Sequence, residues 1–181
     1  MLGDFVRGTR DDLSARFPPD LVEGILLHRA IDYFTDQHPV FLRSKLLLAP
    51  ERRRFAGIII DVLFDHFLAQ NWSQYSRIPL PEFIDEMYAL LDRNSAWMTP
   101  ELREIIPRMR SENWLGTYGT IEGLALTFRR ISRRRAFLAP IIGAEDDLTA
   151  HYHSFGKAFR EFYPDALVFS ETWSSADPEK D

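Results

Sequence analysis

Three ionisable side chains interrupt an otherwise apolar stretch at residues 56–69, which reads Ala-Gly-Ile-Ile-Ile-Asp-Val-Leu-Phe-Asp-His-Phe-Leu-Ala. In a helix, Asp61 and Asp65 stand four residues apart and project from the same face, whereas His66 is displaced by about 100° from Asp65. Two carboxylates on one buried face repel each other and require an arginine, a shared proton or a metal ion. The stretch therefore predicts a site with a counter-charge.

Other ionisable residues occupy helix positions where apolar side chains are expected. His28 and Asp32 continue the apolar stripe of a preceding helix, and Asp4 lies near the start of the chain. Packed helices can bring such side chains together, which is how histidine and carboxylate metal sites are built in helical bundles. Nitrogen and oxygen ligands without sulfur suit manganese, iron, magnesium or zinc. These residues therefore predict a metal site in a helical core.

Each of these residues also has a structural interpretation. His28 could be a core histidine that is bonded to a backbone carbonyl, and Asp61 with Asp65 could pair with Arg29 and Arg7 in a buried ion network. For any single residue, the structural interpretation is preferred. For the whole set of five polar groups on helix faces, a functional cluster explains the pattern better.

Length and composition favour one globular domain. The chain has 181 residues, of which 45% are hydrophobic and 13% aromatic. The absence of cysteine excludes disulfides, iron–sulfur clusters and thiolate zinc sites. No apolar run is long enough to cross a membrane, and the charges at Asp4 and Arg7 are not typical of a signal peptide. We therefore expect a cytoplasmic protein that does not bind a membrane.

Charge is unevenly distributed along the chain. The net charge of −5 argues against general nucleic-acid binding. Eight of the 22 basic residues nevertheless lie in two short segments, 52–54 and 129–135. A local positive field of this kind suits a phosphorylated or acidic partner. Solvated helix faces and charges at helix C-termini would produce the same pattern.

The periodicity of apolar residues predicts an all-α fold, a single-domain helical bundle of about seven helices. Proline, capping residues and acidic first turns set the expected helix starts. No alternation with a period of two and no hairpin signal indicates a strand. We expect residues 1–169 to form the domain and residues 170–181 to form a flexible C-terminal tail. The expected helices cover residues 20–35, 40–48, 51–70, 82–94, 100–114, 120–135 and a last segment from 146.

Several common catalytic arrangements are missing. The chain has no cysteine nucleophile, no Gly-x-Ser-x-Gly segment and no glycine-rich phosphate loop. Metal-assisted hydrolysis is the enzymatic chemistry that the carboxylates and histidines would support. In such sites, a metal lowers the pKa of bound water and offsets charge on phosphoryl oxygens.

The chain resembles the acyl carrier protein phosphodiesterases along nearly its whole length, up to Pro164. The resemblance is carried by several segments in the same order, including Leu2-Gly-Asp-Phe-Val-Arg-Gly8, Gly24-Ile-Leu-Leu-His-Arg-Ala-Ile-Asp32, Asp61-Val-Leu-Phe-Asp-His-Phe-Leu68 and Phe162-Tyr-Pro164. It implies an HD-domain-like helical fold and dependence on Mn²⁺, with Fe²⁺ or Mg²⁺ as alternatives. The implied reaction hydrolyses the phosphodiester between phosphopantetheine and a serine of holo acyl carrier protein, giving the apo protein.

The resemblance also assigns roles to individual residues. The implied metal ligands are Asp4, His28, Asp32, Asp61 and Asp65. The implied catalytic residues are Asp4, Arg29 and His66, with His66 as a proton donor to the leaving serine oxygen. The implied substrate-binding residues are Arg7, Arg52, Arg53 and Arg54. Arg29 or Arg7 would hold a phosphate oxygen, and the three arginines at residues 52–54 would steer the acidic carrier protein.

Two other functions fit the same residues. One is a phosphohydrolase that acts on a nucleotide or another small phosphodiester. The other is a non-catalytic helical module that binds acyl carrier protein. Stoichiometric bound metal in the purified protein would favour an enzyme over the module.

Overall fold

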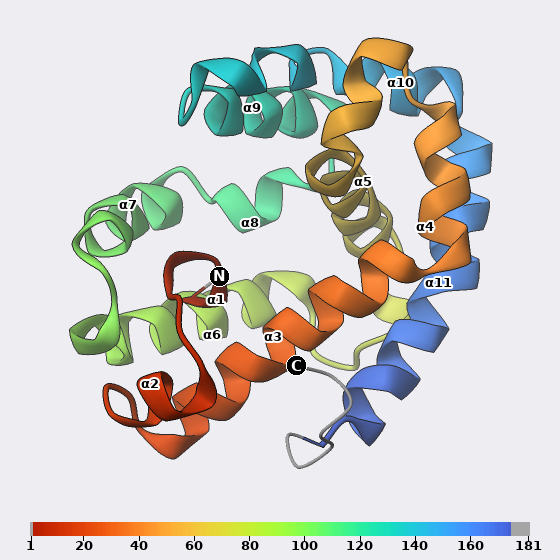
Figure 1. Ribbon diagram of the computed structural model, residues 1–181. Helices are drawn as coiled ribbons and strands as arrows, with labels where there is room; N and C mark the ends of the chain where they lie inside the picture. The colour runs from red at the N-terminus through yellow and green to blue at the C-terminus, as the bar shows by residue number, and fades with distance from the viewer. Residues whose placement is uncertain (1, 175–181) are drawn as a thin grey trace.

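The computed structural model describes residues 2–174, apart from the side chains of residues 2 and 4. Every regular element in this part of the chain is helical (Figure 1), which confirms the all-α prediction. The structure divides the chain more finely than the expected set of about seven helices. The reason is that several expected helices begin or end with a short 3-10 segment, and the last one is interrupted at His151.

The N-terminal part of the chain forms three helices, of which the first two contact the third. They are α1 (Leu2–Phe5), α2 (Arg10–Ser14) and α3 (Pro19–Gln37). Gly8 adopts a φ of 127°, which a residue with a side chain rarely adopts, and this allows the chain to reverse between α1 and α2. Thr9 then caps α2 in a capping box with Asp12. The turn brings α1 and α2 back against α3.

A run of short helices leads into the central helix. The chain continues through α4 (Pro39–Ser44), η1 (Lys45–Leu47), η2 (Pro50–Phe55) and α5 (Ala56–Gln70). The three arginines expected in the first turn of the central helix lie in η2 instead. The basic side chains therefore lie directly before the positive N-terminal end of α5, where they are not favoured electrostatically.

The second half of the chain surrounds α5. It comprises η3 (Trp72–Gln74), α6 (Leu80–Arg93), η4 (Ser95–Trp97), α7 (Pro100–Ser111), α8 (Trp114–Thr117), α9 (Ile121–Ser132), η5 (Ala136–Ile141), α10 (Ala144–Ala150) and α11 (Tyr152–Thr172). In Figure 1, α9 and α10 lie above α5, α11 lies to its right, α7 and α8 lie to its left, and α6 lies below α8.

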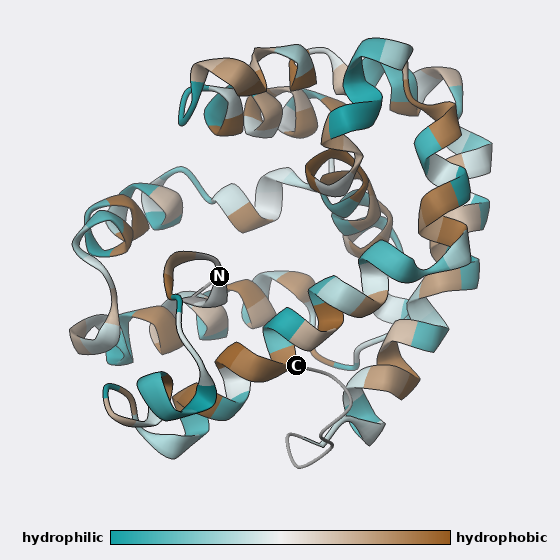
Figure 2. Ribbon diagram, viewed as in Figure 1, coloured by the Kyte–Doolittle hydropathy of each residue, from teal (hydrophilic) through white to brown (hydrophobic). Residues whose placement is uncertain are grey.

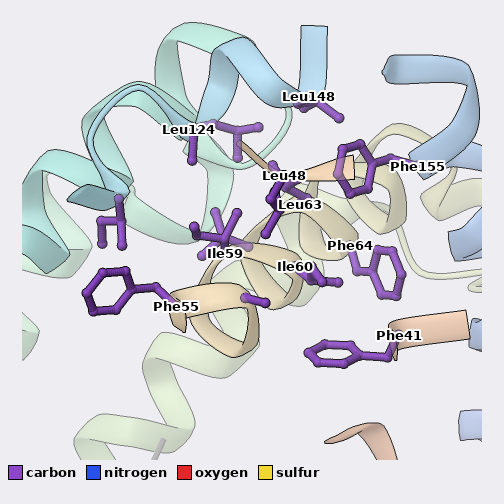
Figure 3. Packing of buried hydrophobic residues seen from close by; sticks show 14 of the residues in the cluster. Phe41, Leu48, Phe55, Ile59, Ile60, Leu63, Phe64, Leu124, Leu148 and Phe155 are labelled. Atoms are coloured by element: carbon purple, nitrogen blue, oxygen red, sulfur yellow. The ribbon is translucent and has the colours of Figure 1, made fainter. Parts of the chain in front are cut away.

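The main hydrophobic core is built around α5. Figure 2 shows that this helix is mostly hydrophobic, whereas α3 and α11 alternate hydrophobic and hydrophilic residues. Ile59 and Leu63 are completely buried. In Figure 3 they point toward Leu124 of α9 and Leu148 of α10, with Phe155 of α11 nearby. Burial of each such side chain contributes about 1.5–3 kcal/mol, so this packing fixes the orientation of α5.

A second, smaller core joins α6 to α7. It contains Tyr88 and buried apolar side chains from both helices and from the segment between them. The Tyr88 hydroxyl donates a hydrogen bond to the Met109 carbonyl at 2.8 Å and accepts one from the Leu115 amide at 3.2 Å. Through these two bonds, Tyr88 fixes α8 against α6 and α7.

The C-terminal helix differs from the prediction. It passes through Pro164 and ends at Thr172, so residues 170–172 are helical and not part of a tail. Residues 175–181 of the predicted tail lie outside the described residues. None of the helices in the described range is both long enough and apolar enough to cross a membrane.

Candidate active site

Asp61 and Asp65 project from the same side of α5, as their spacing predicts. Both line a cavity of about 550 Å³, here called the α8 cavity, whose wall is formed mainly by α5, α7, α8 and α9. Both also line a cavity of about 410 Å³, here called the α11 cavity, between α3, α5 and α11. The two carboxylates therefore lie where two cavities meet on the central helix.

Asp61 and Asp65 are both exposed where the two cavities open, so the face that they share is not buried as the sequence predicted. Asp65 makes no hydrogen bond or ion pair with any residue that the structure describes. Desolvation raises the pKa of its carboxyl group to about 7, because no positive partner compensates for the loss of water. A carboxyl group with this pKa can exchange a proton near neutral pH or accept a cation.

Asp32 of α3 joins the two α5 carboxylates in the wall of the α11 cavity. The Oδ2 atom of Asp32 lies 3.4 Å from Nε2 of His28, one helical turn earlier. The His28 ring in turn packs against Gly3 of α1 so closely that a Cβ atom at residue 3 would clash with it. Asp4 belongs to α1, but its side chain is outside the described part of the structure.

The donor set has the chemistry that a divalent cation requires, although its geometry is incomplete. The partnerless carboxylate of Asp65 fits such a cation, and Asp32 and Asp61 line the same cavity. Among the described side chains, no three histidine or acidic groups are clustered tightly enough to hold a metal ion. The predicted ligand set, which includes Asp4, therefore stays a prediction.

His66 lies in the core and not in either cavity, so its predicted role as proton donor does not fit its surroundings. Its side chain is buried, with 2% exposed. Nδ1 donates to the Tyr118 carbonyl at 2.9 Å, and Nε2 accepts from the Tyr152 hydroxyl at 3.0 Å. Desolvation lowers the pKa of His66, which favours this neutral form. The displacement of about 100° from Asp65 places His66 on a different face of α5.

Arg29 holds the N-terminal segment onto α3. Its guanidinium donates to the carbonyl oxygens of Gly8 at 2.8 Å and Val6 at 2.9 Å. Arg7 is exposed on the same segment. Neither arginine lines the α8 or the α11 cavity. Neither arginine forms an ion pair with Asp65 in the described structure, so the alternative of a buried ion network with this residue is not supported. Their placement also gives no support to the predicted contact with phosphate.

The basic segment at residues 52–54 is largely engaged with the protein itself. Arg52 donates to both carboxylate oxygens of Asp147, at 3.2 and 3.3 Å. Arg53 donates to the carbonyl oxygens of Leu48 and Leu46 at the end of η1. Arg54 lies over the Phe55 ring, 4.8 Å from its centroid. None of the three lines either cavity. Arg52 and Arg53 therefore have structural roles, and Arg54 is the candidate for contact with a partner.

The α8 cavity contains basic and aromatic residues that the sequence analysis did not assign to the site. Arg130, Arg134 and Arg135 line it together with Trp114 and Tyr118. Burial and the Asp65 charge raise the pKa of Tyr118, whereas the charge of Arg134 opposes this shift. The available sequence signal was the basic run at residues 129–135, which the sequence analysis assigned only to a local positive field.

Comparison with known proteins identifies the family. The model of the family described as acyl carrier protein phosphodiesterase matches residues 1–166. A protein of that name from Enterobacter sp. strain 638 is 34% identical, with 93% of this chain and 86% of the relative covered. One from Pectobacterium atrosepticum is 32% identical, with 95% and 88% covered. No solved structure matches the chain. The match over most of the sequence shows that this chain belongs to the acyl carrier protein phosphodiesterase family.

Proposed function

We propose that this protein hydrolyses the phosphodiester between phosphopantetheine and a serine of holo acyl carrier protein. Family membership supports this reaction, since relatives that cover most of the chain carry the name acyl carrier protein phosphodiesterase. The structural observation that carries the proposal is the Asp65 carboxyl group. It is accessible from two cavities, has no partner among the described residues and has a pKa of about 7.

The proposed cofactor is a divalent cation, with Mn²⁺ preferred and Fe²⁺ or Mg²⁺ as alternatives. The proposed ligands are Asp4, His28, Asp32, Asp61 and Asp65. When bound, such a cation offsets negative charge on phosphoryl oxygens. The His28–Asp32 contact orients the imidazole, which is a common arrangement beside metal sites. The likeness to HD-type metal phosphohydrolases belongs to the same proposal.

The proposed partner is the acidic carrier protein itself. Arg54 is exposed beside the core, and its guanidinium is held over Phe55 without a carboxylate partner among the described residues. A positive side chain at this position would raise the rate of association with an acidic surface. This role is narrower than the one that the sequence suggested for all three arginines of η2.

The test of the proposed function uses mass spectrometry. Holo acyl carrier protein is incubated with the purified protein and Mn²⁺, and the expected product is the apo form. Asp65→Asn should lower the rate at least about 100-fold, as expected for loss of a group that acts in proton transfer or cation binding. Asp85→Asn is the matched control, because Asp85 is exposed on α6 and lines neither cavity. Persistence of the holo form with the unmodified protein and each of the three cations would refute the proposal.

A further inference from the structure

Three arginines share the wall of the α8 cavity with the two α5 carboxylates. Arg130 lies in the last turn of α9, and Arg134 and Arg135 follow directly after this helix. Asp61 and Asp65 line the same cavity. A cavity that combines carboxylates with three guanidinium groups can bind an anionic group on its basic part and carry out chemistry on its acidic part.

Arg130 is held in place by contacts on one side of its guanidinium, whereas two of its nitrogen atoms lack a hydrogen-bond acceptor. Only 10% of its side chain is exposed. Its Nη2 atom donates to Oε2 of Glu112 at 2.6 Å, and its Cζ atom lies 4.5 Å from the centroid of the Trp114 ring. The Nε and Nη1 atoms are buried and have no hydrogen-bond acceptor. Buried donors without an acceptor are unfavourable, so this residue is suited to receive an oxygen atom from a ligand.

Glu112 and Trp114 hold this guanidinium in position. The indole Nε1 of Trp114 donates to Glu112 Oε2 at 2.8 Å, the same oxygen that accepts from Arg130. Hydrogen bonds from Arg108, Trp114 and Arg130 lower the pKa of Glu112 to about 2, so this carboxylate stays ionised. Glu112 and Trp114 thus keep the side chain of Arg130 in one orientation, so less conformational entropy is lost when a ligand binds.

Arg134 and Arg135 supply further positive charge beside this anchor. Both side chains are exposed, and neither forms a hydrogen bond or ion pair with any described residue. The charges of Arg134 and Asp65 both act on the Tyr118 hydroxyl, with opposite effects on its pKa. The cavity wall therefore combines one fixed arginine, Arg130, with two exposed arginines, and it also contains the carboxyl group of Asp65.

We propose that Arg130, Arg134 and Arg135 form a phosphate-binding wall, in which Arg130 is the fixed donor and the other two close around the phosphate. The ligand class is a phosphate group in a monoester or diester, because the planar forks of guanidinium groups match phosphate oxygens. This inference rests on the proposed function, in which the bound group is the phosphate of the substrate and of the released phosphopantetheine. It replaces Arg7 and Arg29 as the predicted holders of that phosphate.

The binding test uses inorganic phosphate as the probe and the full chain, by isothermal titration calorimetry with EDTA and again with Mg²⁺. Arg134→Gln and Arg130→Lys should each weaken phosphate binding about tenfold or more. Arg129→Gln is the matched control, because Arg129 is the exposed neighbour of Arg130 on α9 and does not line the cavity. This variant should stay within about twofold of the parent, as expected for a residue without contact to the ligand.

Either of two results would overturn the phosphate-binding wall: no saturable phosphate binding to the unmodified protein, or equal affinities for the parent and the Arg134→Gln variant. Arg134 is exposed, so its variant remains informative if Arg130→Lys fails to fold. A kinetic measurement separates this inference from the proposed function. Release of phosphopantetheine with a KM that no arginine variant changes would refute the wall and leave the reaction. Phosphate binding that depends on the arginines, without release of phosphopantetheine, would support the phosphate-binding wall and refute the proposed reaction.

Discussion

The Nε2 atom of His66 accepts a hydrogen bond from the Tyr152 hydroxyl at 3.0 Å, which links the central helix α5 to the start of α11. The carbonyl oxygen of Tyr118 accepts the proton on Nδ1, so both ring nitrogens are used inside the protein. A histidine in this state holds three parts of the chain together: α5, the connection between α8 and α9, and α11. It has no free nitrogen with which to donate a proton to a substrate.

Replacement of Tyr152 by phenylalanine tests this structural role. Tyr152→Phe removes one hydrogen bond from His66 and should lower the free energy of unfolding by about 1 kcal/mol, with kcat unchanged. Urea denaturation and steady-state kinetics measure the two effects. Tyr33→Phe is the control, because Tyr33 is 67% exposed and should have no effect on either. A large fall in kcat without loss of stability would instead support the predicted catalytic role of His66.

Asp65 should make the free energy of unfolding depend on pH, and the Asn variant should lose this dependence. Its pKa rises from 3.8 in the unfolded reference to about 7 in the fold, so the folded state binds the proton more tightly. The stabilising contribution is complete below pH 3.8 and is lost as pH rises through about 7. In EDTA, Asp65→Asn should therefore become progressively more stable than the parent between pH 4 and pH 8. Denaturant titrations across this range measure the difference, and a constant difference would contradict the raised pKa of this carboxyl group.

A pair of glycine substitutions tests the position of the α8 wall. A Cβ atom at Gly123 would clash with the backbone of Thr117, so Gly123→Ala must displace α8 from α9 and should destabilise the protein by about 1–3 kcal/mol. Gly24 in α3 has no atom within 4 Å of an added Cβ. Gly24→Ala should stabilise by about 0.5–1 kcal/mol, since alanine restricts the unfolded chain. Thermal unfolding compares the two, and equal effects would contradict close packing of α8 on α9.

Arg52 and Arg54 should respond differently to replacement by alanine. Loss of Arg52 leaves Asp147, only 12% exposed, without its partner, so Arg52→Ala should lower the free energy of unfolding by about 1.5–3 kcal/mol. Arg54→Ala should change stability by less than about 0.5 kcal/mol. The Arg54 variant should instead raise KM for the carrier protein at low ionic strength, with the difference disappearing in high salt. A KM for Arg54→Ala that equals the parent value at low salt would remove Arg54 from the proposed docking surface.

Local patterns in the sequence were sufficient for the all-α fold and for the placement of Asp61 and Asp65. Both follow from helical periodicity, which relates residues three or four positions apart whatever the rest of the chain does. The same rule correctly separated His66 from the two aspartates. The family resemblance, carried by segments along the whole chain, likewise agrees with the family comparison.

Contacts between distant segments were decided only by the tertiary structure. Arg52 pairs with Asp147, which is 95 residues away, and His66 contacts a hydroxyl 86 residues away. Periodicity shows that a face is apolar or charged, but it does not show which other face will cover it. That choice depends on how the other helices pack around α5, and this packing gave structural roles to Arg52 and Arg53, which the sequence analysis had assigned to substrate binding. It also brought Arg130 and Arg134, which in the sequence were only a basic run, to the same cavity as Asp65.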